Sequence, residues 1–287
     1  MILVGVDGSH AGMEAARWAA READLRGVPL RIANAIPAWA CSAVPQGRFT
    51  RVAAWMRDGA AAVLGTAMER VHAVAPGVQA DTAILAGDPR PALIEAAADA
   101  ELLVIGNHGL GGFRGLLLGS VAYGVAGQAP CDVAVVREVP AAPRPEIVAG
   151  IDGSPAGARV LDFAFAEAAL RGIGLRVVHA YSPLQAGGGF APVPDDFDDE
   201  ETEVRMVREA LAGRRGLYPD VKVVEEVVRG HPAEVLRHAS AGAELLVVGS
   251  RGHGEFTGLL LGSVCQAMLH YAKCPMVVVR TSRRPAG

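Results

Sequence analysis

An internal repeat constrains the fold of this 287-residue chain more than any other feature of its sequence. Three segments of the first half return in the same order in the second half, at an offset of 145 residues for the first pair and 143 for the other two. The pairs are Val4–Ser9 with Ala149–Ser154, Gly87–Pro89 with Gly230–Pro232, and Gly115–Val121 with Gly258–Val264. A nearly constant offset indicates a duplicated domain rather than a chance motif. We therefore expect two similar domains at residues 1–137 and 147–282, joined by a stiff, proline-containing linker at residues 138–146.

Each half alternates short apolar runs with longer segments that suit helices, a pattern typical of a parallel α/β sheet. The expected strands cover residues 2–6, 30–35, 78–85, 102–105 and 133–136 in the first half, and 175–181, 221–228, 245–248 and 276–279 in the second. The expected helices cover residues 11–26, 52–72, 91–98 and 120–127, and another helix follows the N-cap residue Ser154 and Pro155. We predict an α/β fold of two tandem, doubly wound, five-stranded parallel sheets with strand order 3-2-1-4-5.

Charge and hydropathy exclude several classes of partner. The net charge is −4, and no basic stripe is present, which argues against nucleic acid. No apolar run is long enough to cross a bilayer and the N-terminus does not resemble a signal peptide, so we expect a soluble, cytoplasmic protein without a membrane partner. Cys41, Cys131, Cys265 and Cys274 lack metal-ligand spacing, and we expect Cys131 and Cys274 to be small core residues because each precedes an apolar strand.

A glycine-rich segment follows the fourth expected strand of each half, with the pattern Gly-x-x-Gly-x9-Gly-Ser. Its residues are Gly106, Gly109, Gly119 and Ser120 in the first half, and Gly249, Gly252, Gly262 and Ser263 in the second. Glycine allows the backbone to approach a polyphosphate closely and to adopt unusual φ and ψ angles. The serine stands where the next helix begins, so its hydroxyl and the free N–H groups behind it can donate to phosphate oxygens.

An aspartate ends the first expected strand of each half, Asp7 in one and Asp152 in the other. With strand order 3-2-1-4-5, strands one and four flank the crevice where doubly wound sheets bind their ligands. The aspartate and the glycine loop therefore converge on one place in each half. A tight turn with a helix cap remains the alternative explanation for either motif alone.

Several absent or ambiguous motifs narrow the function further. There is no P-loop motif and no G-x-S-x-G motif, so neither a P-loop ATPase nor an α/β-hydrolase site is expected. His108, Arg114, Arg251 and His253 are candidates to neutralise phosphate charge, whereas His179 is expected in or beside a strand. The acidic segment at residues 195–201 indicates a solvated loop that runs into a helix start, with an acidic docking or cation site as the alternative.

The paired starts and glycine loops resemble the universal stress protein family, in its tandem two-domain, ATP-binding form, over essentially the whole chain. The resemblance implies an adenine nucleotide alpha hydrolase-like fold, with ATP as the ligand and Mg²⁺ often on its phosphates. It also implies that residues 133–136 and 276–279 pair the domains about a pseudo-twofold axis, and that a homodimer can form. Family loops often carry a basic residue after the second glycine, where this chain has Leu110 and His253. The resemblance therefore implies weaker phosphate binding in the first half.

The same resemblance assigns ligand-binding positions in both halves. Asp7 and Asp152 would contact the adenosine, and Ala35 and Ala180 would offer backbone atoms to the adenine. The phosphate positions are Gly106, Gly109, Gly119, Ser120 and Val121 in the first half, and Gly249, Gly252, Gly262, Ser263 and Val264 in the second.

Three functions follow from these features. The leading hypothesis is a nucleotide-binding module of the stress response, with nucleotide in both halves. The second is a slow ATP hydrolase or nucleotidyl transferase, for which only Asp7 and Asp152 qualify as catalytic groups and no base is evident. The third is an interaction scaffold with vestigial crevices, which the intact glycine loops of both halves disfavour. From the sequence we assign no catalytic residue and no metal-ligating side chain, and we predict no particular protein partner.

Overall fold

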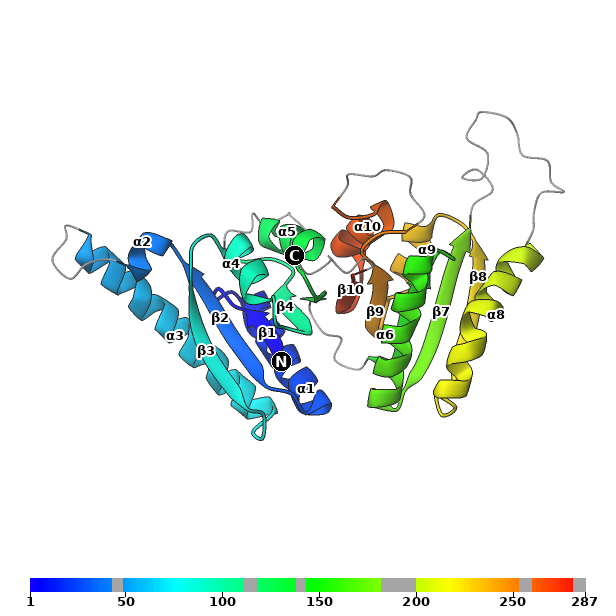
Figure 1. Ribbon diagram of the computed structural model, residues 1–287, viewed down its shortest axis with the longest axis horizontal. Coiled ribbons are helices and arrows are strands. Elements are labelled where there is room, and N and C mark those ends of the chain that lie inside the picture. Colours follow the sequence, from blue (N-terminus) through cyan, green and yellow to red (C-terminus); the bar gives the residue numbers. More distant parts are fainter. Residues whose placement is uncertain (43–48, 111–117, 138–142, 182–199, 253–259, 281–287) are drawn as a thin grey trace, which may run out of the picture. The chain divides into compact units, whose positions relative to one another are not determined.

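The computed structural model describes residues 1–42, 49–110, 118–137, 143–181, 200–252 and 260–280, and Figure 1 shows their helices and strands. The chain divides into two compact units, with the boundary after residue 138. The described part of unit one ends at residue 137, and that of unit two runs from 143 to 280. No helix in these described ranges is long and apolar enough to cross a membrane; the predicted cytoplasmic location stays a prediction.

Unit one is built on a parallel sheet in the order β3-β2-β1-β4-β5. Its strands are β1 (Ile2–Gly5), β2 (Leu30–Ile36), β3 (Ala80–Ala86), β4 (Leu102–Gly106) and β5 (Asp132–Val136). Strand β1 is central, and its residues Ile2, Leu3 and Val4 are fully buried. A strand covered on both faces needs this unbroken run of aliphatic side chains. The order matches the prediction from the sequence.

Helices cover both faces of this sheet: α1 (His10–Arg26), α2 (Ala38–Cys41), α3 (Thr50–Val74), α4 (Pro89–Ala96) and α5 (Ser120–Gln128). Helix α1 packs against α3, and α4 against α5. A Cβ atom at Gly5 would meet Leu93 of α4, whereas one at Gly106 would meet Ala11 of α1. Since Gly5 is in register with Ile105, Gly106 faces the other side of the sheet. The α4–α5 pair and the α1–α3 pair therefore lie on opposite faces.

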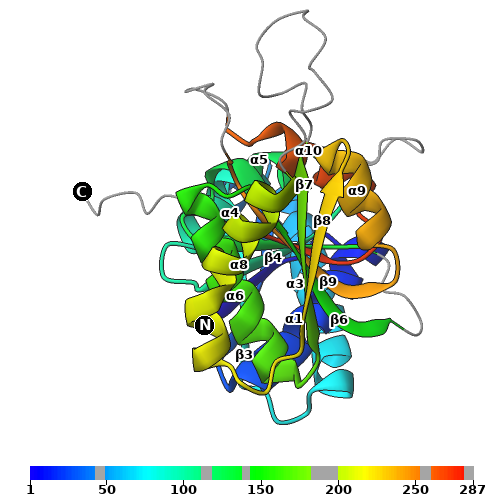
Figure 2. The ribbon, with the colours of Figure 1, turned by 90° about the vertical axis from the view of Figure 1, so that its right-hand side faces the viewer.

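Unit two repeats this arrangement in the order β8-β7-β6-β9-β10, again with parallel strand pairs. Its strands are β6 (Arg144–Ile151), β7 (Gly174–Tyr181), β8 (Val223–Arg229), β9 (Ala243–Gly249) and β10 (Met276–Val279). Its helices are α6 (Pro155–Arg171), α8 (Glu200–Leu217), α9 (Pro232–Ala239) and α10 (Ser263–Tyr271). Figure 2 shows α6 and α8 on one side of strands β7 and β8, and α9 on the other.

The first helix of each unit begins and ends with the same local signals. Ser9 and Ser154 cap α1 and α6, each accepting a hydrogen bond from the N–H three residues later. Gly27 and Gly172 end these helices with φ of 64°, in the left-handed region that glycine adopts without strain. The predicted N-cap at Ser154 is therefore confirmed, and the repeat extends to the backbone angles.

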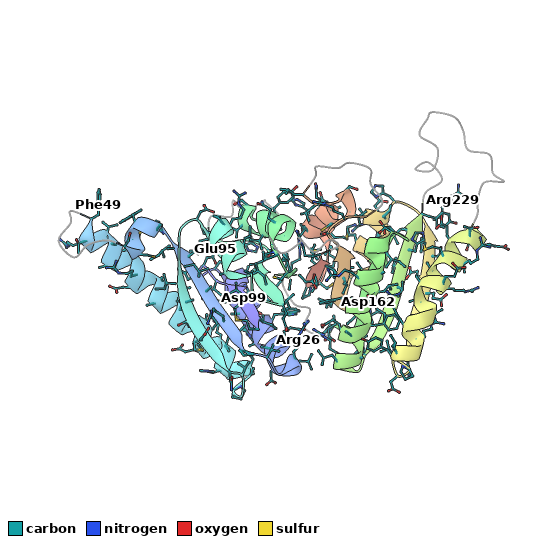
Figure 3. The ribbon with its side chains drawn as sticks, in the orientation of Figure 1. Arg26, Phe49, Glu95, Asp99, Asp162 and Arg229 are labelled. Carbon is teal, nitrogen blue, oxygen red and sulfur yellow. The ribbon has the colours of Figure 1, made fainter. Side chains whose placement is uncertain are left out.

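Each unit also carries a triad of charged groups at the end of its first helix. In unit one the Arg26 guanidinium, labelled in Figure 3, lies 2.9 Å from the carboxylate of Glu22 and 3.5 Å from that of Glu101. The side chain of Glu22 is only 2% exposed, so its charge depends on Arg26 for compensation. The equivalent groups in unit two are Glu167, Arg171 and Glu244.

The predicted element boundaries lie within two residues of those observed, and the differences have local causes. Helix α4 starts at Pro89 rather than at the predicted residue 91, because the side chain of Asp88 caps it by accepting the N–H of Arg90. Strand β6 starts at Arg144, inside the stretch expected as linker, and its pairing with β9 shifts register between Arg144 and Ile147. Helix α2 was not predicted. Residues 138–142 and 195–199 lie outside the described residues, while Glu200 and Glu201 form the first turn of α8.

Candidate nucleotide site

The candidate site of unit one is a cavity of about 440 Å³ at the carboxyl ends of β1, β2 and β4, beside α4 and α5. All seven site residues predicted in this half line it: Asp7, Ala35, Gly106, Gly109, Gly119, Ser120 and Val121. The other described lining residues are Gly5, Val6, Gly12, Ala33, Asn34, Pro89, Leu93, Ile105, His108, Leu110, Leu118 and Ala122. The volume falls in the range of small-molecule sites. Residues 111–117, with Arg114, lie outside the described residues.

The carboxylate of Asp7 ties the two walls of this cavity together. Its Oδ1 accepts the N–H of Ser9 at 2.9 Å, and its Oδ2 accepts the N–H of Leu110 at 2.8 Å. One bond stays within the turn after β1, and the other reaches the loop after β4. Asp7 is therefore a positioning residue for the loop, and its predicted contact with adenosine stays a prediction.

The glycines of the loop are required by close packing. A Cβ atom on Gly109 would collide with Oδ2 of Asp7, and one on Gly106 would lie 2.7 Å from the carbonyl carbon of Ala11. A Cβ atom on Gly119 would lie 3.3 Å from Cα of His108. None of these three glycines has a positive φ, so the expectation that they provide unusual backbone angles was wrong. In the turn after Asp7, by contrast, Gly8 has a φ of 88°.

The N-terminus of α5 supplies hydrogen-bond donors at the cavity. Its N-cap residue Gly119 makes no side-chain cap, and the N–H of Gly119 donates to the carbonyl of Asn107 at 2.7 Å. Ser120, Val121 and Ala122 form the first turn and all three line the cavity. N–H groups of a first helical turn have no partner within the helix, so they suit an anion.

The other end of the cavity is apolar. Gly5, Ala33 and Ile105 stand in register across β1, β2 and β4, and all three line the cavity together with Leu93 of α4. The side-chain amide of Asn34 donates to the carbonyl of Val6 at 2.8 Å and holds β2 against the end of β1. An apolar slot beside backbone donors can hold a flat ring at one end and a phosphate at the other.

Unit two repeats the same scaffold. Oδ1 of Asp152 accepts the N–H of Ser154 at 3.0 Å and the hydroxyl of Ser154 at 2.6 Å. A Cβ atom on Gly252 would collide with Oδ2 of Asp152, as at Gly109 in unit one. Helix α10 begins at Ser263 after the N-cap Gly262, which makes no side-chain cap. The predicted residues Ala180, Gly249 and Val264 occupy the equivalent places in β7, β9 and α10.

Comparison with known proteins agrees with this architecture. A model described as the universal stress protein family matches residues 1–137 and again residues 144–280. The chain belongs to the universal stress protein family. Two universal stress proteins of Mycobacterium tuberculosis, Rv2005c and Rv2623, are each 34% identical to it. The first alignment covers 98% of this chain and 97% of the relative, and the second 98% and 96%.

A solved structure of a universal stress protein shares the fold. It comes from Archaeoglobus fulgidus and aligns over 98% of both chains, with a TM-score of 0.72 and 20% identity. A further universal stress protein, solved in complex with cAMP, is 32% identical over 47% of this chain and 95% of its own length, with a TM-score of 0.38.

Asn34 and His179, which occupy the same position in β2 and β7, were not predicted as site residues. His179, predicted as a strand residue, is 5% exposed, with Nδ1 3.0 Å from the carbonyl oxygen of Ile151 and Nε2 2.9 Å from Oε2 of Glu203. Each residue ties its strand to the end of the first strand of its unit. The repeat offset of 145 residues, which pairs Asn34 with His179, was the available signal.

The charged residues of the two glycine loops differ. Among the described residues that line the cavity of unit one, His108 is the only basic side chain and Asp7 the only acidic one. Arg251 stands at the position of His108 in unit two and is exposed. His253 lies outside the described residues. Within the described residues, no three side chains of His, Cys, Asp or Glu gather where they could hold a metal ion.

Proposed function

We propose that this universal stress protein binds ATP in the cavity of unit one, with the phosphates on the N-terminus of α5 and the adenine in the apolar slot. The observation that carries the proposal is the convergence of all seven predicted residues on that single cavity. The same donors at α10 support a second nucleotide site in unit two. Nucleotide occupancy would then be the signal that the protein contributes to a stress response.

The helix start and the apolar surface of the cavity support a ligand with an anionic end and a flat apolar end. Ser120, Val121 and Ala122 of one helix start line the cavity, and hydrogen bonds from N–H groups to a charged acceptor contribute about 1.5–3 kcal/mol each. The helix dipole adds about 0.3–1 kcal/mol for an anion near the first turn. The apolar row of Gly5, Ala33 and Ile105 supplies a surface against which a purine ring loses contact with water. Mg²⁺ would arrive on the phosphates, and this part of the prediction rests on the family resemblance.

The substitution Ser120→Asp separates ligand binding from folding. An acidic side chain in the first turn of α5 favours the helix dipole, so the melting temperature should stay the same or rise. The same carboxylate stands where the phosphates are proposed to lie, so affinity for ATP should fall by about tenfold or more. Isothermal titration calorimetry with ATP measures the affinity. Thr66→Asp on the exposed face of α3 is the control, and it should bind ATP as the wild type does.

The purified protein gives a second, independent readout. Nucleotide released by heating should be identified as an adenine nucleotide by chromatography. An empty supernatant together with no heat of ATP binding would reject the proposed function. Unchanged ATP affinity in Ser120→Asp would show that the phosphates bind elsewhere.

A further inference from the structure

The slot for the base is built by one row of residues across the sheet of unit one. Gly5 pairs in register with Ala33 of β2 and with Ile105 of β4, and all three line the cavity. Residues in register on parallel strands point to the same face of a sheet. A Cβ atom at Gly5 would lie 2.9 Å from Leu93 of α4, so this row faces α4. Ala33, with a single methyl group, leaves the slot open on the β2 side.

The same row in unit two is filled differently. Gly150 pairs in register with Val178 of β7 and with Val248 of β9. A Cβ atom at Gly150 would lie 2.8 Å from Leu236 of α9, so the row again faces the second helix pair. Val178 carries two methyl groups more than Ala33, its equivalent in unit one, and both residues are 1% exposed. Unit two thus has Val178 on β7 where unit one has Ala33 on β2, and Val248 on β9 where unit one has Ile105 on β4.

A second difference between the units lies on the helix side of the same row. Ala122, the third residue of α5, lines the cavity of unit one, and the third residue of α10 is Cys265. The Cys265 side chain is 2% exposed. Burial raises the pKa of its thiol to about 12.

The groups proposed to bind phosphate are kept in unit two. Gly262 and Ser263 reproduce the helix start, and Arg251 replaces His108 with a permanently charged group. Arg251 is exposed, so water and salt screen its attraction for a phosphate. The steric effect of the buried side chains of Val178 and Cys265 is not weakened by water or salt, because the protein interior is closely packed. We therefore expect the residues around the purine ring, rather than those around the phosphates, to set the difference in nucleotide affinity between the units.

We propose that the two crevices are not equivalent, and that Val178 and Cys265 weaken the binding of the purine ring in unit two while Ala33 and Ala122 admit it in unit one. This inference rests on the proposed nucleotide binding and makes it specific. ATP binds one crevice per chain tightly, and the other at least about tenfold more weakly. A ligand that needs only the phosphate donors retains access to unit two.

Titration calorimetry of the full chain with ATP tests the inference. The wild-type protein should bind one ATP per chain in its tight phase. The double variant Val178→Ala/Cys265→Ala should bind two with similar affinity, because the slot of unit two is opened. The converse variant Ala33→Val/Ala122→Cys should lose the tight phase. Val224→Ala/Cys41→Ala is the matched control, since it makes the same two changes at exposed positions, and it should behave as the wild type.

Each outcome bears on one proposal. Two equal tight sites in the wild type, or a Val178→Ala/Cys265→Ala variant that still binds one ATP, overturns the inference and leaves nucleotide binding intact. A wild-type protein that binds no ATP at all overturns the proposed function instead. Circular dichroism and thermal melting confirm that each variant is folded. Where a double variant fails to fold, Val178→Ala alone decides, and it should strengthen the weak phase by about threefold or more.

Discussion

At the scale of single residues, Asp7 and Gly109 depend on each other. The Asp7 carboxylate reaches the N–H of Leu110 only because residue 109 has no side chain in its path. The spacing of the glycines is visible in the sequence, and it placed Gly109 at the crevice. The reason for the glycine is not visible there, because it depends on a carboxylate about a hundred residues earlier in the chain. Asn34 and His179 were missed for the same reason, since their partners become neighbours only in the folded sheet.

The substitution Gly109→Ala tests this dependence. The added methyl group must displace the Asp7 carboxylate, which breaks its bond to Leu110 and loosens the loop after β4. We expect a loss of about 1–3 kcal/mol in the free energy of unfolding, together with weaker ATP binding. Urea unfolding and calorimetry measure the two effects.

Gly65→Ala is the control for that substitution. Gly65 lies in α3, where a Cβ atom would meet nothing within 4 Å, so alanine should stabilise the helix by about 0.5–1 kcal/mol. If Gly109→Ala is as stable as Gly65→Ala and binds ATP normally, the carboxylate does not position the loop.

At the scale of elements, the helices were predictable where local signals mark their ends. Ser154 followed by proline predicted the start of α6, and the start of α5 at Ser120 was correct. Helix α4 was placed two residues late because its cap, Asp88, stands before two prolines that both suit a first turn. Helix α2 has only four residues, which is too short for a periodic pattern to develop. The ion-pair triad was not predicted from the sequence either, because Arg26 and Glu101 are distant in the chain.

The triad at the end of α1 gives a prediction for stability. Arg26→Ala removes the guanidinium that lies 2.9 Å from the buried carboxylate of Glu22, and we expect a loss of about 3 kcal/mol in the free energy of unfolding. The double variant Glu22→Leu/Arg26→Leu should recover much of this loss, because it removes both charges together. Chemical unfolding monitored by circular dichroism provides the free energies.

A second ion pair of α1 serves as the reference. Arg17 and Glu14 lie 3.6 Å apart with the arginine side chain 37% exposed, so Arg17→Ala should cost less than about 1 kcal/mol. Equal losses in Arg26→Ala and Arg17→Ala would show that the triad adds no more than a surface pair.

At the scale of the whole molecule, the duplication was the most informative feature of the sequence. It predicted two α/β units and, with the strand pattern, the order of the strands in unit one. The chemistry of each crevice was less predictable, because Ala33 and Val178 each lie two residues before the position assigned to the adenine, and neither was itself predicted as a ligand contact. Their difference becomes meaningful only when the register pairs Ala33 with Gly5 and Val178 with Gly150, in the row that lines the cavity in unit one. The pairing of the units through their last strands and the homodimer stay predictions.

A crystal structure of the full chain grown with ATP tests nucleotide binding most directly. We predict phosphate oxygens within about 3 Å of the N–H groups of Ser120, Val121 and Ala122, with the adenine against Ala33 in the slot of unit one. A crevice of unit one that contains no nucleotide under saturating ATP, or a nucleotide bound away from the start of α5, would contradict this prediction.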